Sequence, residues 1–438
     1  NKFKITKNNK FFPNFLIFLS FFINFSIFYP FKNIVFSYDN LNIQNISQAK
    51  EENLRLKVVD KNLLEQKIKQ GKEYLLMIID KETGGVPKYY WPEKDLKEDK
   101  LRTTYTSTTL YSLLKIYNNF DKDEKIIENI PKITEFIFSM QNNDKNSRAY
   151  GGFHYSFDKK TGQKDYKFVA GTNSKTIYTL LDLYKITGDK KYLNSAERAA
   201  DFLLTLQEKD GKISSYIIDK NNKYYKNKKF SFLYNGQTLS ALSRVYKIDN
   251  KEKYYLSAKK IADNFIKTIQ EKGCYLGDDY RSPNPISSSW VVMSLIDFYK
   301  INPEKKYKDI IFKCSDELLL KQYQNKNNLL SYGSWENSSS TSGTGWIGEV
   351  MSEVYNFCKK EKGSDCEKYK DSVIKASRWI IERTYSKEDA QKLNNYKIIG
   401  GIFWDYKEEY IRTDSVAHAL NGYVNIFKDL KDGILLSL

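Results

Sequence analysis

The richest group of acid–base side chains lies in the stretch GGIFWDYKEEYIRTDSVAHAL, at residues 400–420. Asp405 follows an aromatic run, and apolar surroundings can raise the pKa of a carboxyl group as a general acid requires. Arg412, Asp414 and His418 follow at the predicted start of an amphipathic helix. Asp414 and His418 are four residues apart and so share one helix face. Asp414 is predicted either to orient His418 or to cap its own helix.

Two further sets of residues suggest different chemistry. Asp278 and Asp279 are adjacent, so one of them would hold a proton if both were buried; a solvated turn is the alternative interpretation. His154 and Tyr155 lie in the glycine loop GGFHYSF, and with Arg412 they would suit β-elimination from a uronic acid. A glycosidase instead needs two carboxyl groups on either side of the bond. The carboxylates expected near the site are Asp278, Asp279, Glu336, Glu349, Asp405 and Asp414.

Aromatic and polar residues gather where several predicted helices begin. Aromatic platforms with hydrogen-bonding neighbours suit a sugar ring, whereas packing in the core is the alternative for each tryptophan. Asn, Ser and Thr at these positions are equally suited to helix capping. The candidate substrate-binding residues are His154, Tyr155, Asn235, Tyr280, Trp346, Trp404 and Arg412. The candidate catalytic residues are Asp405, Asp414, His418, Asp278 and Asp279.

Two kinds of helix alternate from residue 60 onward and position these groups. Apolar residues at three- and four-residue spacing indicate a helix in each segment. Lys-rich helices, several ending in Gln, are predicted at roughly 62–80, 123–141, 190–207, 252–270, 304–324 and 364–385. Less charged helices are predicted at roughly 103–118, 172–187, 235–248, 288–301, 343–358 and 412–428.

The connections between these helices differ systematically. A turn of a few residues follows each less charged helix, whereas a long loop with glycine and aromatic residues follows each Lys-rich helix. Short turns make antiparallel neighbours, so the long loops collect at one end. Six hairpins predict an all-α (α/α)6 toroid at residues 60–438, with the less charged helices inside. An open solenoid of helix pairs is the competing arrangement.

This pattern resembles the (α/α)6 toroids of the six-hairpin glycosidase-like group. The resemblance rests on the hairpin number, the loop asymmetry and the Gly-Gly-aromatic turns at 84–91, 151–157 and 400–404. It implies a polysaccharide hydrolase, a lyase or a sugar epimerase. Terpenoid-cyclase and prenyltransferase toroids share the hairpin pattern. However, the sequence lacks the Asp-x-Asp-Asp string of the cyclase acid and a convincing Asp, Cys and His set for a prenyltransferase zinc.

The N-terminal segment predicts a signal peptide or a membrane anchor at residues 1–37. Four lysines lie in residues 1–10, and residues 11–29 are apolar apart from scattered Asn and Ser. A basic stretch before an apolar core is typical of export signals and of uncleaved anchors. Small residues favour cleavage after Ser37, and residues 38–59 are a predicted linker. We therefore expect a periplasmic, cell-surface or secreted protein, or one anchored to the membrane through this segment.

The composition limits the possible partners and cofactors. The 438 residues carry a formal net charge of +17, which favours anionic partners such as an acidic polysaccharide; a general Lys and Asn bias is the alternative. No basic run is interleaved with stacking aromatics, so we expect no nucleic-acid partner. Four cysteines and two histidines match no zinc motif, so neither a metal nor a cofactor is predicted. Cys358 and Cys366 flank a short turn and can pair.

The leading hypothesis is an exported or membrane-anchored enzyme that acts on a polysaccharide or oligosaccharide. Glycoside hydrolysis ranks ahead of a lyase or uronyl epimerase reaction because several carboxylates are available. A non-catalytic protein for glycan binding or surface-polymer assembly is the second hypothesis. A terpenoid-cyclase-like toroid is the third, and the polar starts of the inner helices count against its apolar cavity.

Overall fold

A computed structural model describes residues 58–220, 223–336 and 340–430. The predicted signal or anchor at residues 1–37 and nearly all of the predicted linker lie outside these residues. The outer helices are α2 (Lys61–Ile78), α4 (Glu124–Ser139), α6 (Lys190–Thr205), α8 (Glu252–Lys272), α10 (Lys305–Leu319) and α12 (Glu367–Ile381). The inner helices are α3 (Thr103–Asn119), α5 (Ala170–Thr187), α7 (Phe232–Asp249), α9 (Pro285–Tyr299), α11 (Thr341–Lys360) and α14 (Thr413–Phe427).

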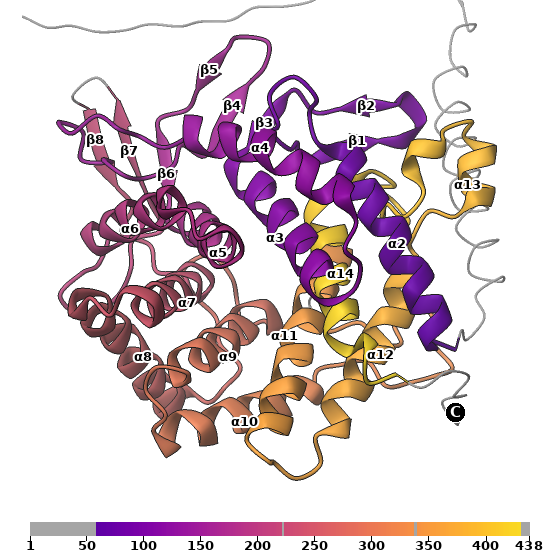
Figure 1. The fold of residues 1–438 in the computed structure, drawn as a ribbon. Coiled ribbons are helices and arrows are strands. Elements are labelled where there is room, and N and C mark those ends of the chain that lie inside the picture. The colour runs from indigo at the N-terminus through magenta and orange to yellow at the C-terminus, as the bar shows by residue number, and fades with distance from the viewer. Residues whose placement is uncertain (1–57, 221–222, 337–339, 431–438) are drawn as a thin grey trace, which may run out of the picture. The chain divides into compact units, whose positions relative to one another are not determined.

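The inner helices form a closed ring (Figure 1). Each one contacts the next in chain order, and α14 contacts α3, so the last inner helix returns to the first. This arrangement confirms the predicted (α/α)6 toroid and excludes the open solenoid. The predicted helices are all present, with bounds within about one turn of those expected. The short α13 (Lys387–Lys392) is an additional helix that the periodicity did not predict.

The difference in burial explains which helices lie inside. An outer helix such as α6 buries one stripe, with Tyr192, Ser195, Ala196, Ala199 and Ala200 at three- and four-residue steps. An inner helix such as α9 buries nearly every residue, because neighbours pack against it from both sides and from the outer ring. Small Ser, Thr, Ala and Gly side chains let the inner helices approach closely, which is why these helices look less charged in the sequence.

Short antiparallel strands join the long loops, and the helical periodicity did not predict them. They form three sheets of three strands each, in the orders β2-β1-β9, β3-β4-β5 and β6-β7-β8. Their bounds are β1 (Tyr89–Trp91), β2 (Leu96–Lys97), β3 (Lys100–Arg102), β4 (Ser156–Asp158), β5 (Gln163–Lys164), β6 (Lys167–Val169), β7 (Tyr216–Lys220), β8 (Lys223–Lys226) and β9 (Ile411–Arg412). Because β1 pairs with β9, the first and last loops are joined and Arg412 lies opposite Tyr89.

The repeated glutamines link consecutive outer helices. The side-chain amide of Gln141 donates to the carbonyl oxygens of Gly151 at 2.8 Å and Ser195 at 3.0 Å. The first acceptor lies in the following loop and the second lies in the next outer helix. Gln207 and Gln322 make the same two kinds of contact with their own loops and neighbouring helices. The Gln repeat seen in the sequence is therefore a structural repeat.

The glycines of the long loops allow the same close approach. Gly84, Gly151, Gly211, Gly333 and Gly400 have positive φ, and a Cβ at each would lie 2.2–2.8 Å from a backbone atom of the next outer helix. At Gly400 that helix is α2, so this contact closes the outer ring. Only glycine combines this backbone conformation with the absence of a Cβ.

One loop lacks this glycine contact and has a disulfide in its place. A Cβ at Gly273 would meet nothing within 4 Å. The next residue, Cys274, is bonded to Cys314 of α10, which is the following outer helix. The second disulfide joins Cys358 and Cys366, as the short turn between them allowed. Within the described ranges, no helix combines the length and apolarity needed to cross a bilayer.

Candidate functional site

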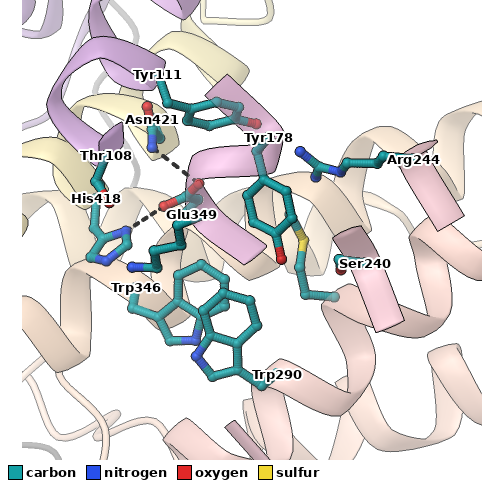
Figure 2. A pocket seen from close by; sticks show the side chains of 12 residues that line it. Thr108, Tyr111, Tyr178, Ser240, Arg244, Trp290, Trp346, Glu349, His418 and Asn421 are labelled. Carbon is teal, nitrogen blue, oxygen red and sulfur yellow. Dashed lines mark hydrogen bonds and ion pairs between the residues drawn. The ribbon is translucent and has the colours of Figure 1, made fainter. Parts of the chain in front are cut away.

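The inner ring encloses a small axial cavity to which all six inner helices contribute. Each helix contributes two residues separated by three or four positions, which is the spacing of one helix face. The lining residues are Thr108, Tyr111, Lys175, Tyr178, Ser240, Arg244, Trp290, Met293, Trp346, Glu349, His418 and Asn421. About 30 Å³ of this space is free to the centre of a water-sized molecule, and the whole empty space between the lining side chains, including the part open to solvent, is about 400 Å³. Figure 2 shows the side chains converging from several helices on this space.

A carboxylate–histidine pair lies in this cavity. Nδ1 of His418 is 2.7 Å from Oε2 of Glu349, and the amide of Asn421 donates to Oε1 of Glu349 at 3.1 Å (Figure 2). Only 3% of Glu349 and 6% of His418 is exposed. A carboxylate that accepts from Nδ1–H fixes the imidazole tautomer and leaves Nε2 available for proton transfer. No hydrogen-bond partner for Nε2 is found among the described residues.

Two stacked tryptophans form part of the cavity wall beside this pair. The rings of Trp290 and Trp346 are 3.8 Å apart with an angle of 13° between their planes. The indole N–H of Trp346 donates to Ser289 Oγ at 2.9 Å, which fixes its orientation. The same ring lies 5.2 Å from the imidazole of His418 in an edge-on arrangement. Trp346 was predicted to bind substrate, and it lies next to the one histidine that lines the cavity.

A lysine also lines the cavity. The ammonium of Lys175 lies 5.9 Å from the centre of the Trp290 ring. Burial lowers the pKa of Lys175, while the carboxylates of Asp414 and Glu349 act in the opposite direction. Lys175 was not among the predicted site residues, since a lysine on a helix is usually a solvated side chain. Its register was the available signal, because it occupies the same place in α5 as His418 does in α14.

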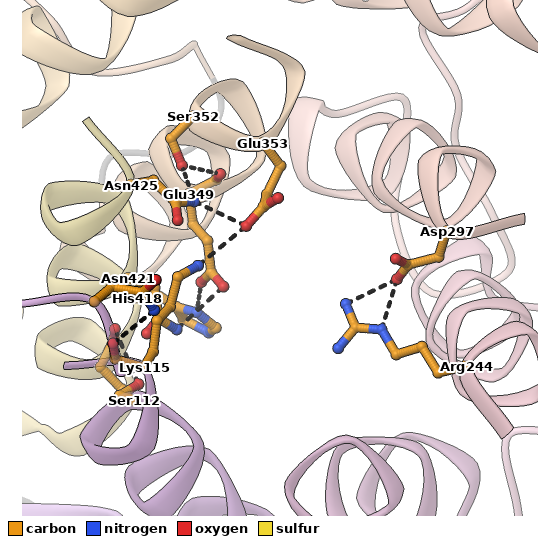
Figure 3. Close-up of polar contacts among 12 residues, drawn as sticks. Ser112, Lys115, Arg244, Asp297, Glu349, Ser352, Glu353, His418, Asn421 and Asn425 are labelled. Carbon is orange, nitrogen blue, oxygen red and sulfur yellow. Dashed lines mark hydrogen bonds and ion pairs between the residues drawn. The ribbon is translucent and has the colours of Figure 1, made fainter. Parts of the chain in front are cut away.

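Ion pairs surround the axis toward the C-terminal ends of the inner helices (Figure 3). Lys115 bonds to Glu353 at 3.0 Å, and Arg244 bonds to Asp297 at 2.8 Å. Burial alone would raise the pKa of Glu353, but the ammonium groups of Lys115 and Lys300 together with the amide of Asn425 outweigh it, and the pKa falls to about 2. For the same reason Arg244 holds the pKa of Asp297 below its usual range, against the effect of burial. This level is therefore charged but internally paired.

Asp414 lies on the other side of the cavity, toward the loops, and neither of the two roles predicted for it is found. Its carboxylate accepts from Nε and Nη2 of Arg412 at 2.9 and 2.5 Å, so it neither holds His418 nor caps α14. The residue that holds His418 is Glu349. Burial would raise the pKa of Asp414, but Arg412 reverses this effect and the pKa is lowered. Arg412 also donates to Tyr105 and stacks at 4.2 Å on Trp404.

The other three candidate catalytic carboxylates bind backbone in the loops. Asp405 accepts from the N–H groups of Lys407 and Glu408 at 2.8 Å, as in an ordinary turn. Asp278 accepts from the backbone of Phe232, Tyr280 and Arg281, and Asp279 accepts from the backbone of Phe230 at 2.7 Å. None of the three lines the axial cavity. Asp278 is half-buried and Asp279 is exposed, so the burial that would let one of them hold a proton is absent, and the alternative interpretation of a turn fits both.

His154 and Tyr155 do not join Arg412. The ring of His154 contacts the carbonyl of Asp165 and packs 4.7 Å from Phe168, and burial lowers its pKa. It lines a separate groove between the loops. Tyr155 is half-buried, and burial raises its pKa. No contact in the described ranges connects these three side chains, so the geometry expected for β-elimination is absent from this part of the chain.

Two further candidates for substrate binding have structural partners. The side chain of Asn235 exchanges hydrogen bonds with the backbone of Ile213 and also donates to Ser231 O. Asn235 lies one turn inside α7, whose N-cap is Ser231, because the helix begins earlier than predicted. The hydroxyl of Tyr280 donates to Asn227 at 3.0 Å, and 42% of Tyr280 is exposed. Within the described residues, no cluster of His, Cys, Asp and Glu is arranged to hold a metal.

Comparisons with known proteins agree with this architecture. Residues 114–330 match the family described as Beta-L-arabinofuranosidase, GH127 catalytic domain. This match ends before Glu349 and His418. No curated protein matches the chain.

Solved structures of carbohydrate-active enzymes have the same fold. Cellobiose 2-epimerase from Bacillus thermoamylovorans B4167 is 14% identical with a TM-score of 0.63, covering 84% of this chain and 100% of that one. The GH76A α-1,6-mannanase from Salegentibacter sp. HEL1_6 is 11% identical with a TM-score of 0.59, covering 83% and 98%. An unsaturated glucuronyl hydrolase specific for heparin is 14% identical with a TM-score of 0.58, covering 84% and 97%. The chain thus has the six-hairpin glycosidase-like (α/α)6 fold and is similar to carbohydrate-active enzymes.

Proposed function

We propose that this six-hairpin glycosidase-like chain is a sugar isomerase that transfers a proton through His418. The observation that carries the proposal is the imidazole held at Nδ1 by Glu349 in the axial cavity, with no described residue bonded to its Nε2. Cellobiose 2-epimerase and D-mannose isomerase, two enzymes of similar structure, are named for reactions of this kind.

The state of the carboxylates supports proton transfer over hydrolysis. Hydrolysis of a glycosidic bond usually needs one protonated carboxyl group. Asp414 is kept ionised by Arg412, and both oxygens of Glu349 accept hydrogen bonds. The imidazole of His418 is therefore the best-placed proton carrier in the cavity.

The reaction follows from this single base. Nε2 of His418 removes the proton from C2 of an open-chain aldose, and the C–H electron pair forms the double bond of an enediol while the carbonyl oxygen takes a proton from water. The imidazolium exchanges its proton with solvent and then protonates C1, water takes the proton of the O2 hydroxyl, and a ketose results. Glu349 stabilises the imidazolium in between. One imidazole can serve both carbons on one face, whereas epimerisation would need a second acid on the opposite face.

Deuterium incorporation tests this function. The full chain is incubated with a panel of aldoses and ketoses in D2O, and products are followed by NMR. We expect aldose–ketose conversion with deuterium at the carbon that receives the proton. His418→Gln should reduce kcat by about 10³-fold or more, while His154→Gln, the matched change at the other histidine, should leave it unchanged. An equal loss in both variants, or conversion without deuterium uptake by any sugar, would contradict the assignment.

A glycoside hydrolase is the second candidate, favoured by the GH127 family match over residues 114–330. In that case Glu349 or Asp414 would act on the anomeric carbon and His418 would donate the proton. Release of 4-nitrophenol from nitrophenyl arabinofuranosides, or of new reducing ends from polysaccharide, without deuterium in the sugar, would favour this candidate over isomerisation.

Export or anchoring is a further part of the proposal and rests on the sequence of residues 1–37. Cell fractionation with N-terminal sequencing of the recovered protein tests it. We expect a chain outside the cytoplasm that starts after Ser37, or a longer chain in the membrane fraction. Recovery of the intact chain in the cytoplasmic fraction would contradict both.

A further inference from the structure

The charged groups around the axial cavity fall into pairs, with one exception. Arg412 pairs with Asp414, Arg244 with Asp297, and Lys115 with Glu353. These pairs satisfy the charge of each member within the protein, which burial requires. The remaining cation is Lys175, whose ammonium has neither an ion pair nor a hydrogen bond within the described ranges.

The position of Lys175 makes its isolation informative. It occupies the same place in α5 as His418 in α14, Trp290 in α9 and Trp346 in α11, so these four side chains lie at one level of the ring. Helix α3 separates α5 from α14 in the ring. A ligand at this level can therefore contact the ammonium and the imidazole at two different points of its own structure.

Other polar atoms of the cavity also lack partners. Ser240 Oγ and Asn421 Oδ1 are buried without a hydrogen bond, although both residues line the cavity. Buried polar groups are normally satisfied, so such atoms indicate a polar occupant. The third nitrogen of the Arg244 guanidinium, Nη1, has no hydrogen bond to another described residue, since Asp297 takes Nε and Nη2 and the guanidinium lies over the ring of Tyr178. The cavity thus offers two cationic donors together with hydroxyl and amide groups.

We propose that Lys175 binds the carboxylate of an acidic sugar, so that the substrate of the isomerase is a uronic acid. This inference rests on the proposed function, because it names the substrate class of the same site. An ammonium without a counter-ion gains most from an anionic ligand when it is removed from water. The lowered pKa of Lys175, caused first by burial, agrees with such desolvation.

A carboxylate fits better than a phosphate. A phosphate carries nearly two charges and usually takes several donors, often from a helix N-terminus. Lys175 lies in the second turn of its helix, where the backbone N–H groups are already bonded. Arg244 lies about two turns further along its own helix, so the ammonium is the cationic donor at the level of His418. The trioxygen phosphate head is also bulkier than a planar carboxylate, and the cavity is small. Glucose 6-phosphate is therefore the appropriate competing probe.

The test compares matched sugars and matched lysines. D-glucuronate, D-glucose and D-glucose 6-phosphate are offered to the full chain, to Lys175→Met and to Lys185→Met. Lys185 lies on the same helix but is exposed and paired with Asp182. We expect wild type to prefer glucuronate over glucose, and Lys175→Met to lower kcat/KM for glucuronate by about 10- to 150-fold. That loss should arise mainly in KM, with glucose changed less than about threefold, and Lys185→Met should match wild type. Circular dichroism confirms the fold of each variant.

Several outcomes would overturn the inference about the carboxylate while the proposed isomerase function still holds. These are equal turnover of glucose by wild type, a preference for glucose 6-phosphate, or the same loss for all sugars in Lys175→Met. The last result would mean that Lys175 acts at the reacting carbons, which all three sugars share. If no sugar is converted, the proposed function fails, and Trp fluorescence then decides the ligand class. Saturable quenching by glucuronate that weakens at least about tenfold in Lys175→Met would support the carboxylate site, and equal affinity would overturn it.

Discussion

Glu349 and His418 meet at 2.7 Å although they are 69 residues apart in the sequence. The contact joins α11 to α14, which are neighbours in the inner ring. Because both side chains are almost fully buried, the carboxylate has few ways to satisfy its oxygens other than His418 and Asn421. Burial therefore fixes the hydrogen bond between Glu349 and His418, and predictions about catalysis start from this pair.

Glu349→Gln should abolish most turnover while preserving the fold. The Gln side chain can donate as well as accept, so it no longer enforces a donor at Nδ1 of His418, and it cannot stabilise the imidazolium. We expect kcat to fall by about 10²- to 10⁴-fold, with a much smaller change in KM. Steady-state kinetics measures this, with Glu336→Gln as the control, since Glu336 pairs with Lys321 outside the cavity. Unchanged kcat in Glu349→Gln would mean that the pair is only structural.

Asp405→Asn should retain most of the activity. The carboxylate of Asp405 accepts two backbone hydrogen bonds in a turn, and an Asn side chain can accept the same two. We expect kcat/KM within about threefold of wild type and a loss of stability below about 1 kcal/mol. Kinetics and urea unfolding provide the two readouts. Loss of turnover in a folded Asp405→Asn variant would restore the original prediction that this residue is a catalytic acid.

The sequence was sufficient for the fold because its signals are local. Each signal depends only on residues within one or two elements: helix periodicity, short turns, and the Gln and Gly repeats. The same contacts between neighbouring elements then recur around the ring. The pairing of β1 with β9 was missed because Tyr89 and Arg412 meet only when the ring closes. The local hairpins β1–β2, β4–β5 and β7–β8 were missed because the helical periodicity carries no signal for such short strands.

The site was only partly predictable. Asp414 and His418 are one helical turn apart, so local spacing made them a candidate pair, yet a closer cation, Arg412, takes the carboxylate of Asp414. Glu349 was among the carboxylates expected near the site, but identifying it as the partner of His418 required the register of α11 against α14. The three-residue step from Trp346 to Glu349 matches the step from His418 to Asn421, and that match was the available signal.

Stability in acid should depend on Glu353. Its pKa of about 2 lies below the ordinary value because Lys115, Lys300 and Asn425 together outweigh the effect of burial. A carboxyl group with a lowered folded-state pKa stabilises the protein above its unfolded-state pKa, and this contribution is lost as the pH falls toward the folded-state value. We therefore expect the free energy of unfolding to fall by a Glu353-dependent amount on the order of 1–3 kcal/mol between pH 5 and pH 2.

Urea unfolding at several pH values measures this contribution. The variant Glu353→Gln should be less stable than wild type at pH 7, since Lys115 loses its buried counter-ion, and the difference should shrink toward pH 2. Glu65→Gln is the control, because Glu65 forms an exposed pair with Lys69. A pH-independent difference between wild type and Glu353→Gln would contradict the argument.

The two disulfides should contribute unequally to stability. Cys274 and Cys314 are separated by 40 residues, whereas Cys358 and Cys366 are separated by 8. In the chain-entropy treatment, closing the longer loop stabilises the folded state by about 4 kcal/mol and closing the shorter one by about 2.5 kcal/mol. The longer disulfide also replaces the missing glycine contact between its loop and α10. We therefore expect the double variant Cys274→Ser/Cys314→Ser to lower the free energy of unfolding more than Cys358→Ser/Cys366→Ser does.

Urea unfolding of both variants under oxidising conditions measures the two losses of unfolding free energy. Equal losses, or a larger loss for Cys358→Ser/Cys366→Ser, would show that the bond to α10 does not take over the role of the glycine contact.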